Sequence, residues 1–177
     1  MKQASVHIRA ANNADIDSIR EIEISSGSAF RAVPGLEWIA DEDALPDAKI
    51  RGWVASGTAW VAEESDGRLS GFIVCENVDH ASHIMQVSVR DDCQQRGIGR
   101  TLIDAATDAA READIPVMTL TTFRDVAFNG PFYERIGFHF IDNADLDDRL
   151  QSILAAEEAA GLPIDRRCAM RMEILSV

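Results

Sequence analysis

The chain has 177 residues, of which 46% are hydrophobic and 27% charged, a composition typical of an ordinary globular protein. Its 30 acidic residues outnumber its 17 lysines and arginines, so the formal net charge is −13. Proteins that bind the nucleic-acid backbone need a basic surface, so this balance argues against nucleic acid as a partner. The acidic surplus is expected mainly on the solvated surface, and it mildly favours a cationic small molecule as a partner.

The N-terminal segment Met-Lys-Gln-Ala-Ser is not followed by an apolar stretch, so we expect no signal peptide. No uninterrupted apolar run exceeds four residues, whereas a membrane-spanning helix needs about 20. We therefore expect no membrane span. The cysteines, Cys75, Cys93 and Cys168, are odd in number and widely spaced, which predicts free thiols in a reducing cytoplasm.

Strand-like and helix-like patterns alternate along the chain, which predicts a mixed α/β fold in a single domain, residues 1–177. We expect strands at residues 5–10, 58–63, 69–78, 82–90, 117–121, 138–141 and about 166–175. We expect helices after the start signals Asn12, Asn13 and Asp15, and then at residues 99–113, 126–136 and about 146–160. Glycines and prolines interrupt residues 27–57, where no element is predicted.

One segment carries a chemical signal, the turn Gln94-Gln95-Arg96-Gly97-Ile98-Gly99-Arg100 between an expected strand and an expected helix. A glycine-bearing turn that opens a helix exposes unpaired backbone N–H groups at the positive end of the helix dipole. This arrangement suits a pyrophosphate, and Arg96 or Arg100 could add a charge-assisted contact. The spacing is neither that of a Rossmann fingerprint nor that of a P-loop, and a simple strand-to-helix turn would look similar.

Two motifs together resemble the GCN5-related N-acetyltransferase (GNAT) superfamily. Gln94-x-x-Gly97-x-Gly99, after Val87-Ser88-Val89, resembles its acetyl-CoA pyrophosphate motif. Downstream, the stretch from Tyr133 to Gly137-Phe138 resembles its Tyr-x-x-x-Gly-Phe signature. The resemblance covers the element order of about residues 5–142, with an acetyl-CoA-binding core at about 82–140. It implies a mixed sheet of about six to seven strands, splayed at the acetyl-CoA site and flanked by helices.

The resemblance also implies roles for individual residues. The backbone of Val87, Ser88 and Val89 would pair with the pantetheine arm of acetyl-CoA, and Tyr133 would protonate the departing CoA thiolate. The residues of the turn would hold the pyrophosphate, namely Gln94, Gln95, Arg96, Gly97, Ile98, Gly99 and Arg100. The resemblance implies acetyl-CoA as co-substrate and, as is common among such proteins, a homodimer.

The chain departs from the family pattern at two positions. Many members carry an asparagine seven residues before the tyrosine, where this chain has Val126. Asn129 lies one helical turn before Tyr133 and is a candidate contact to the CoA arm, although a capping or surface role is equally plausible. Some members carry a glutamate base on the central strand, where this chain has Gln86, which cannot accept a proton.

A base matters because an alkyl ammonium has a pKa near ~10.4, so only about one molecule in a few thousand is neutral at pH 7. The candidate bases are Glu37, Glu63, Glu64 and His83, and Gln86 is a candidate for positioning water or the acceptor. No cluster of histidines and cysteines has metal-ligand spacing, so no metal is expected. Cys93, beside the turn, is interpreted as structural.

The predicted activity is transfer of an acetyl group from acetyl-CoA to a small primary amine, by direct attack in a ternary complex. Acceptor specificity in such folds comes from the first helix, the loop after it and the late strands, so the candidate acceptor residues are Phe30, Glu37, Trp38 and Gln86. Two alternatives stay open. One is an acyl-CoA-binding regulatory module without turnover, and the other is a transferase for a different acyl group or a hydroxyl acceptor.

Overall fold

The structure is a computed structural model, and it describes residues 6–174. The strands form a seven-stranded mixed sheet, which confirms the mixed sheet of about six to seven strands that the family resemblance implies. The strand order is β1-β2-β3-β4-β5-β7-β6. The chain forms two compact units, the first made of the residues up to Asn77 together with Met85–Ala109, and the second of Val78–Ile84 together with the residues from Ala110 onward. Each unit is described in turn.

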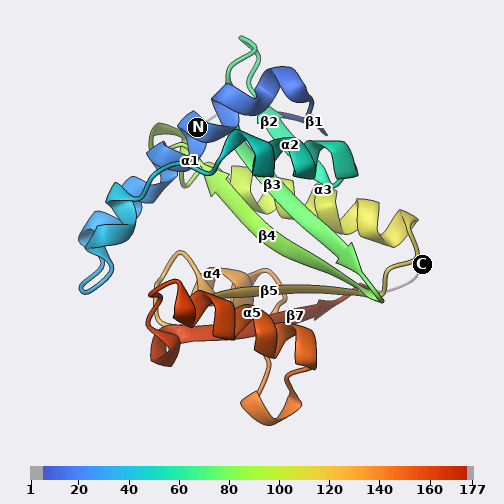
Figure 1. Cartoon of the computed structure of the whole chain (residues 1–177). Helices are drawn as coiled ribbons and strands as arrows, with labels where there is room; N and C mark the ends of the chain where they lie inside the picture. The colour runs from blue at the N-terminus through green and yellow to red at the C-terminus, as the bar shows by residue number, and fades with distance from the viewer. Residues whose placement is uncertain (1–5, 175–177) are drawn as a thin grey trace. The chain divides into compact units, whose positions relative to one another are not determined.

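In the first unit, the strands are β1 (His7–Ala10), β2 (Ala59–Glu63), β3 (Leu69–Val78) and the later part of β4 (Ala81–Val89). β1 pairs with β2, and β2 with β3, in antiparallel fashion. The helices are α1 (Ile16–Gly27), α2 (Asp47–Ser56) and most of α3 (Ile98–Glu112). In Figure 1, α2 lies in front of β3 and α3 behind it.

The core of this unit lies between β2–β3 and the helices α1 and α2. Ile16, Ile19 and Ile22 recur at helical spacing on α1, and all three are buried against Phe72 and Val74 of β3. Helix α3 packs on the opposite face of β3, next to Gly71. The contact is close, since a Cβ added to Gly71 would lie 3.0 Å from a methyl carbon of Leu102. Helices thus cover both faces of β3.

The start of α1 is fixed by a capped turn that also holds a partly buried ion pair. The Asn12 side chain accepts the Ala14 N–H, and the Asp15 carboxylate accepts the Asn12 N–H. Arg9 donates to both Asp15 oxygens, at 2.8 and 2.9 Å. The hydrogen bonds from Arg9 lower the pKa of Asp15 most, and the one from the Asn12 N–H lowers it further, so the pKa lies below its usual range.

Asp15→Asn is expected to lower the free energy of unfolding by about 1–3 kcal/mol at pH 7, because Arg9 loses a charged acceptor. Since the pKa of Asp15 is depressed in the folded state, its contribution is present above the unfolded-state pKa and is lost as the pH falls through the folded-state value. Urea titrations at pH 7, 5 and 3 should therefore show the difference from the parent protein shrinking below about pH 4. A difference that stays constant down to pH 3 would contradict this. Asp17→Asn, which changes an exposed carboxylate of α1, is the control.

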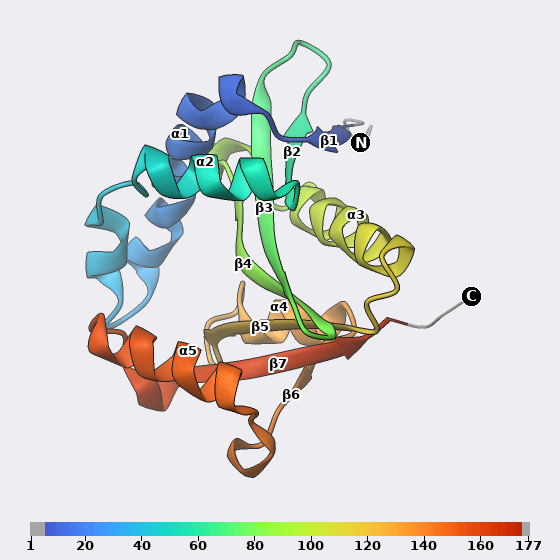
Figure 2. The ribbon, with the colours of Figure 1, turned by 45° about the vertical axis from the view of Figure 1, so that its right-hand side comes forward.

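In the second unit, β5 (Val117–Phe123) pairs in parallel with the first residues of β4 and antiparallel with β7 (Arg167–Glu173). β6 (His139–Phe140) pairs antiparallel with β7. The helices are α4 (Gly130–Arg135) and α5 (Asp148–Ala159). Figure 2 shows α5 in front of β5 and β7, and α4 behind them.

Two sets of contacts hold these helices on opposite faces. On the α5 side, Leu150 and Leu154 pack against Ala169 of β7, and Glu157 forms an ion pair with Arg167 at 2.7 Å. On the other side, Gly137, the second residue after α4, approaches the Met172 side chain of β7. Gly137 has φ +110°, the left-handed conformation expected at the end of a helix.

Short single-turn helices complete the chain. They are η1 (Asn13–Asp15), η2 (Ser28–Ala32), η3 (Glu37–Asp41), η4 (Asp91–Cys93), η5 (Asn143–Asp145) and η6 (Ile164–Arg166). The helix expected at 146–160 spans Asp148–Ala159, and the closing strand expected at 166–175 spans Arg167–Glu173. Residues 27–57, for which no element is predicted, hold η2, η3 and α2.

Candidate functional site

The turn between β4 and α3 presents backbone N–H groups at the start of a long helix. Gln95 and Gly97 both adopt left-handed conformations, with φ of 60° and 84°, which turn the chain sharply into α3. The first hydrogen bond inside the helix is donated by the Thr101 N–H to the Gly97 carbonyl, at 3.0 Å. The N–H groups of Ile98, Gly99 and Arg100 therefore have no acceptor within the helix. Their binding of a pyrophosphate stays a prediction.

The arginines of the turn are already paired with carboxylates. Arg96 donates to Glu64 at 3.0 Å, and Arg100 donates to Asp104, one helical turn further on, at 2.9 Å. The hydrogen bond with Glu64 raises the pKa of Arg96. The positive potential at this turn thus comes first from the backbone, and a direct phosphate contact by either arginine stays a prediction.

The predicted pantetheine-binding residues Val87, Ser88 and Val89 lie on the last part of β4, directly before η4 and the turn. Ser88 is buried, at 7% exposure, and its hydroxyl lies 3.3 Å from the side-chain nitrogen of Gln86. That nitrogen also donates to Glu23 of α1, at 3.2 Å. Glu23 is a residue that the sequence analysis did not single out, because the two residues are 63 positions apart in the chain.

Asn129 is the residue directly before α4, and Tyr133 lies one turn later, within this helix of the second unit. The Asn129 carbonyl accepts the Phe132 and Tyr133 N–H groups, at 2.8 and 3.0 Å. The Tyr133 ring is buried, with edge-to-face contacts to Phe132 and Phe138. The side-chain oxygen of Asn129 is buried without a hydrogen-bond partner. A buried amide oxygen in this state is suited to receive a donor from a ligand.

The structure places the candidate bases in four different settings. Glu63 forms an ion pair with Arg9, and Glu64 forms one with Arg96. His83 is buried, and its Nδ1 lies 2.9 Å from the Thr119 hydroxyl. Glu37 is exposed on η3. Each of the first three is therefore already engaged within its own unit.

The candidate acceptor residues Phe30, Glu37 and Trp38 lie on η2 and η3. Phe30 is half-buried, and Trp38 is exposed to 40%. The neighbouring Leu36 is fully buried and anchors this segment. Their role toward an acceptor stays a prediction.

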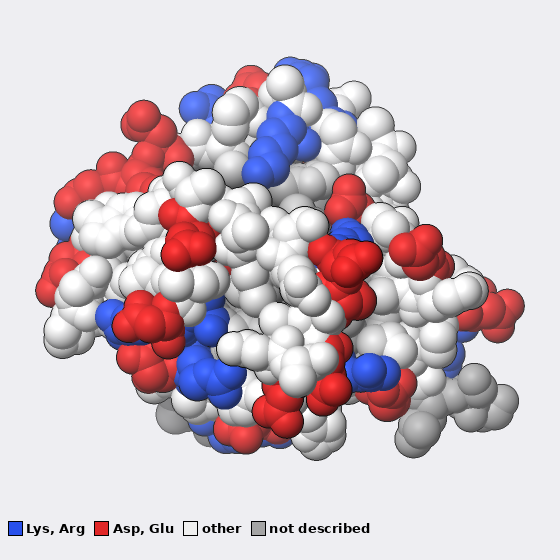
Figure 3. Space-filling view, turned by 60° about the horizontal axis from the view of Figure 1, so that its bottom comes forward, with Lys and Arg blue, Asp and Glu red and all other residues white. Residues whose placement is uncertain are grey.

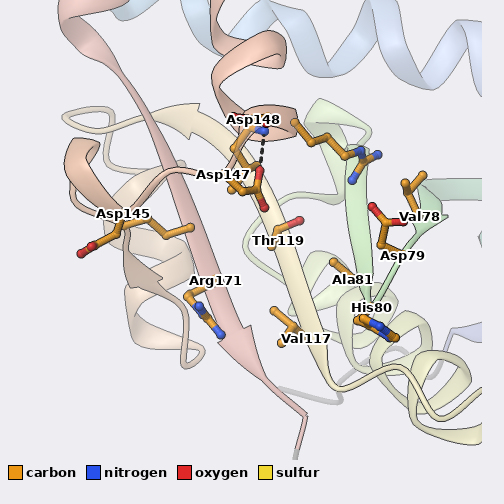
Figure 4. Close-up of a pocket in the computed structure, with 13 residues that line it drawn as sticks. Val78, Asp79, His80, Ala81, Val117, Thr119, Asp145, Asp147, Asp148 and Arg171 are labelled. Carbon is orange, nitrogen blue, oxygen red and sulfur yellow. Dashed lines mark hydrogen bonds between the residues drawn. The ribbon is translucent and has the colours of Figure 1, made fainter.

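A pocket of about 530 Å³ in the second unit contains none of the predicted site residues. It is lined by residues that begin β4 and β5 and by the N-terminal end of α5, together with Arg171 of β7. Four aspartates contribute to its polar lining. One of them, Asp147, caps α5 by accepting the Leu150 N–H, a hydrogen bond drawn in Figure 4. The pocket adjoins Ala81, the first residue of β4.

Charged side chains lie on the surface, whereas the cysteine side chains are buried. On the face shown in Figure 3, acidic side chains are interspersed with basic ones. All cysteines are free and buried. Burial raises the pKa of the Cys93 and Cys168 thiols, which disfavours the nucleophilic thiolate. Within residues 6–174, no group of potential metal ligands clusters, and no helix has the length and apolarity needed to cross a membrane.

Comparison with known proteins yields a consistent set of relatives. The model of the acetyltransferase (GNAT) family matches residues 23–138. The fold is similar to that of the PaiA N-acetyltransferase from Thermoplasma acidophilum in complex with coenzyme A, with a TM-score of 0.74, 18% identity, and coverage of 96% of this chain and 99% of that one.

Two further structures share the fold. One is a Mycobacterium tuberculosis protein that also holds coenzyme A, with a TM-score of 0.69, 18% identity, and coverage of 96% of this chain and 99% of that one. The other is the ribosomal-protein-S18-alanine N-acetyltransferase from Escherichia coli, with a TM-score of 0.66, 15% identity, and coverage of 98% and 96%.

Proposed function

The chain belongs to the GNAT family of acetyltransferases, and from this premise we propose that it transfers the acetyl group of acetyl-CoA to a small primary amine by direct attack in a ternary complex. The use of acetyl-CoA follows from the family, and related folds hold coenzyme A. The choice of a small amine is supported by the net charge of −13, which attracts cations. It is also supported by the exposed carboxylate of Glu37, which directly precedes Trp38 on η3.

The observation that carries the proposal is the turn that opens α3. The N–H groups of Ile98, Gly99 and Arg100 have no acceptor within the helix, and the helix dipole adds positive charge at the same place. A pyrophosphate bound there would accept these hydrogen bonds. Gly97 and Gly99 keep the backbone accessible, since neither carries a Cβ that would stand in the way.

We assign two further roles by family resemblance. Tyr133 donates a proton to the departing thiolate of CoA, which eases the collapse of the tetrahedral intermediate. Asn129 contacts the CoA arm, and its buried, unpartnered side-chain oxygen supports this role. The backbone of Val87–Val89 pairs with the pantetheine arm. A cytoplasmic location fits the free cysteines, whereas a homodimer rests on the resemblance alone.

One observation favours a second candidate function. Gln86 stands where some relatives carry a base, and a glutamine cannot take a proton from an ammonium group. A protein that binds acetyl-CoA and regulates a partner without turnover would not need that base. Binding and turnover must therefore be measured separately.

The first experiment is a thermal-shift titration with acetyl-CoA, followed by measurement of CoA thiol release. A ligand at about 100 times its Kd adds roughly 2.7 kcal/mol to the native state, so we expect a saturable rise in Tm. Thiol release should then be stimulated by at least one amine of a panel that includes spermidine, kanamycin, L-glutamate and an alanine-led peptide. Saturable binding without release for any amine would support the regulatory module. No shift at millimolar acetyl-CoA would overturn the assignment of the turn.

A further inference from the structure

The Glu23 side chain on α1 is held by two neutral hydrogen-bond donors. One carboxylate oxygen accepts from the Gln86 side-chain nitrogen at 3.2 Å, and the other accepts the Leu45 backbone N–H at 2.8 Å. These contacts join α1, the segment before α2, and β4 at one point of the first unit. The carboxylate is half-buried, so it is neither sealed in the core nor freely solvated.

The Glu23 carboxylate differs in its partners from other acidic side chains of the first unit. Within the described part of the chain, it forms no ion pair, although many acidic residues of the same unit do. Glu21, two residues earlier on the same helix, pairs with Arg90 at 2.8 Å. A half-buried carboxylate that is positioned by neutral donors and lacks a cation is suited to bind one from a ligand.

The contact with Gln86 places this carboxylate beside the part of β4 assigned to acetyl-CoA. The Gln86 side-chain nitrogen lies within 3.3 Å of both the Glu23 carboxylate and the Ser88 hydroxyl. Ser88 is one of the residues assigned to the pantetheine arm. Glu23, which is remote from β4 in sequence, thus brings a carboxylate to this part of the strand.

Resting on the proposed function, we propose that Glu23 binds the ammonium group of a cationic acceptor, and that Gln86 is a positioning residue that orients the Glu23 carboxylate. Glu23 thereby determines specificity for amines that are protonated at neutral pH. The Leu45 N–H holds the second oxygen, so the carboxylate keeps one orientation when the acceptor arrives. The remaining lone pairs of its oxygens accept the hydrogen bonds of the ammonium group.

The test is isothermal titration of the CoA-saturated protein with three cationic probes: benzylammonium, spermidine and kanamycin. Benzyl alcohol serves as the uncharged counterpart of benzylammonium. We expect at least one cationic probe to bind, and Glu23→Gln to weaken that binding by about tenfold or more, as for a lost hydrogen bond to a charged group. Affinity for acetyl-CoA and Tm should change little, because the glutamine oxygen still accepts the Leu45 N–H.

The matched control is Asp17→Asn, which removes the same charge from an exposed position of the same helix. It should leave the affinity for the cationic probe within about twofold, since exposed charges act weakly at a distance. Equal losses in both variants, or no loss in Glu23→Gln, would overturn the proposal. So would the failure of every cationic probe to bind while acetyl-CoA still raises Tm, a result that leaves the proposed acetyl-CoA site intact. Absence of acetyl-CoA binding would instead remove the proposed function, and this inference with it.

Discussion

Gly99→Glu is expected to abolish measurable binding of acetyl-CoA, weakening it by about 100-fold or more. Gly99 is the second residue of α3, and its N–H is one of those without an acceptor in the helix. A glutamate there would place a bulky side chain and a negative charge at the proposed pyrophosphate site. Loss of about 100-fold corresponds to roughly 2.7 kcal/mol, about one or two hydrogen bonds to a charged group.

The same substitution should not unfold the protein. Glutamate has a higher helix propensity than glycine, and a negative charge in the first turn of a helix interacts favourably with the dipole. The Tm without ligand should therefore be equal to that of the parent protein or higher. Titration calorimetry with acetyl-CoA then measures binding separately from folding.

The control for this variant is Gly52→Glu. Gly52 is an exposed residue of α2, and a Cβ added there meets no atom within 4 Å. The substitution adds the same side chain and charge to the same unit, far along the chain from the turn. It should bind acetyl-CoA like the parent protein. Micromolar binding by Gly99→Glu would show that the pyrophosphate lies elsewhere.

The element pattern of most of the chain can be read from its sequence, because local signals and tertiary packing agree there. The spacing of Ile16, Ile19 and Ile22 predicts one apolar helix face, and all three are buried. The helix predicted at 126–136 spans only Gly130–Arg135. Its predicted end is close to the observed one, since Gly137 adopts the left-handed conformation typical after a helix. In the apolar face of α1 and in the turn after α4, the residue type alone indicates the structural role.

The segment at 27–57 shows why some elements escape such reading. Pro46 and Gly57 interrupt the pattern, yet they flank α2 directly. Pro46 is the residue before the helix, and Gly57, at φ +74°, is the residue after it. Both are ordinary helix boundaries, but the ten residues between them bury only Ile50 fully. A helix with so narrow an apolar face gives a weak periodic signal.

The candidate site also combines features that are predictable from local sequence with features that are not. The turn is predictable because glycine spacing and position before a helix are local properties of the sequence. The contact between Glu23 and Gln86 is not, because it joins residues 63 positions apart. Ion pairs such as that of Arg96 with Glu64 are equally hidden, and they change which groups supply positive charge at the turn. Long-range polar partners therefore have to be taken from the fold.

Tyr133→Phe is expected to lower kcat by about 100-fold, within the range of general acid catalysis, and to leave the Kd for acetyl-CoA within about twofold. The substitution removes only the hydroxyl group. The ring of Tyr133 is buried between Phe132 and Phe138, and a phenylalanine ring can keep both edge-to-face contacts. The fold and the Tm should thus be largely preserved, so that a change in kcat reports on chemistry.

The pH dependence of kcat separates an acid from a merely structural residue. If Tyr133 donates the proton to the thiolate, kcat of the parent protein falls at alkaline pH, where a tyrosine ionises, and the variant lacks this fall. The double variant Phe132→Tyr/Tyr133→Phe moves the hydroxyl by one residue, to a position about 100° around the helix, and should not recover activity. An unchanged kcat across the pH range in Tyr133→Phe would exclude Tyr133 as the acid. The departing thiolate would then be protonated by another group or by water.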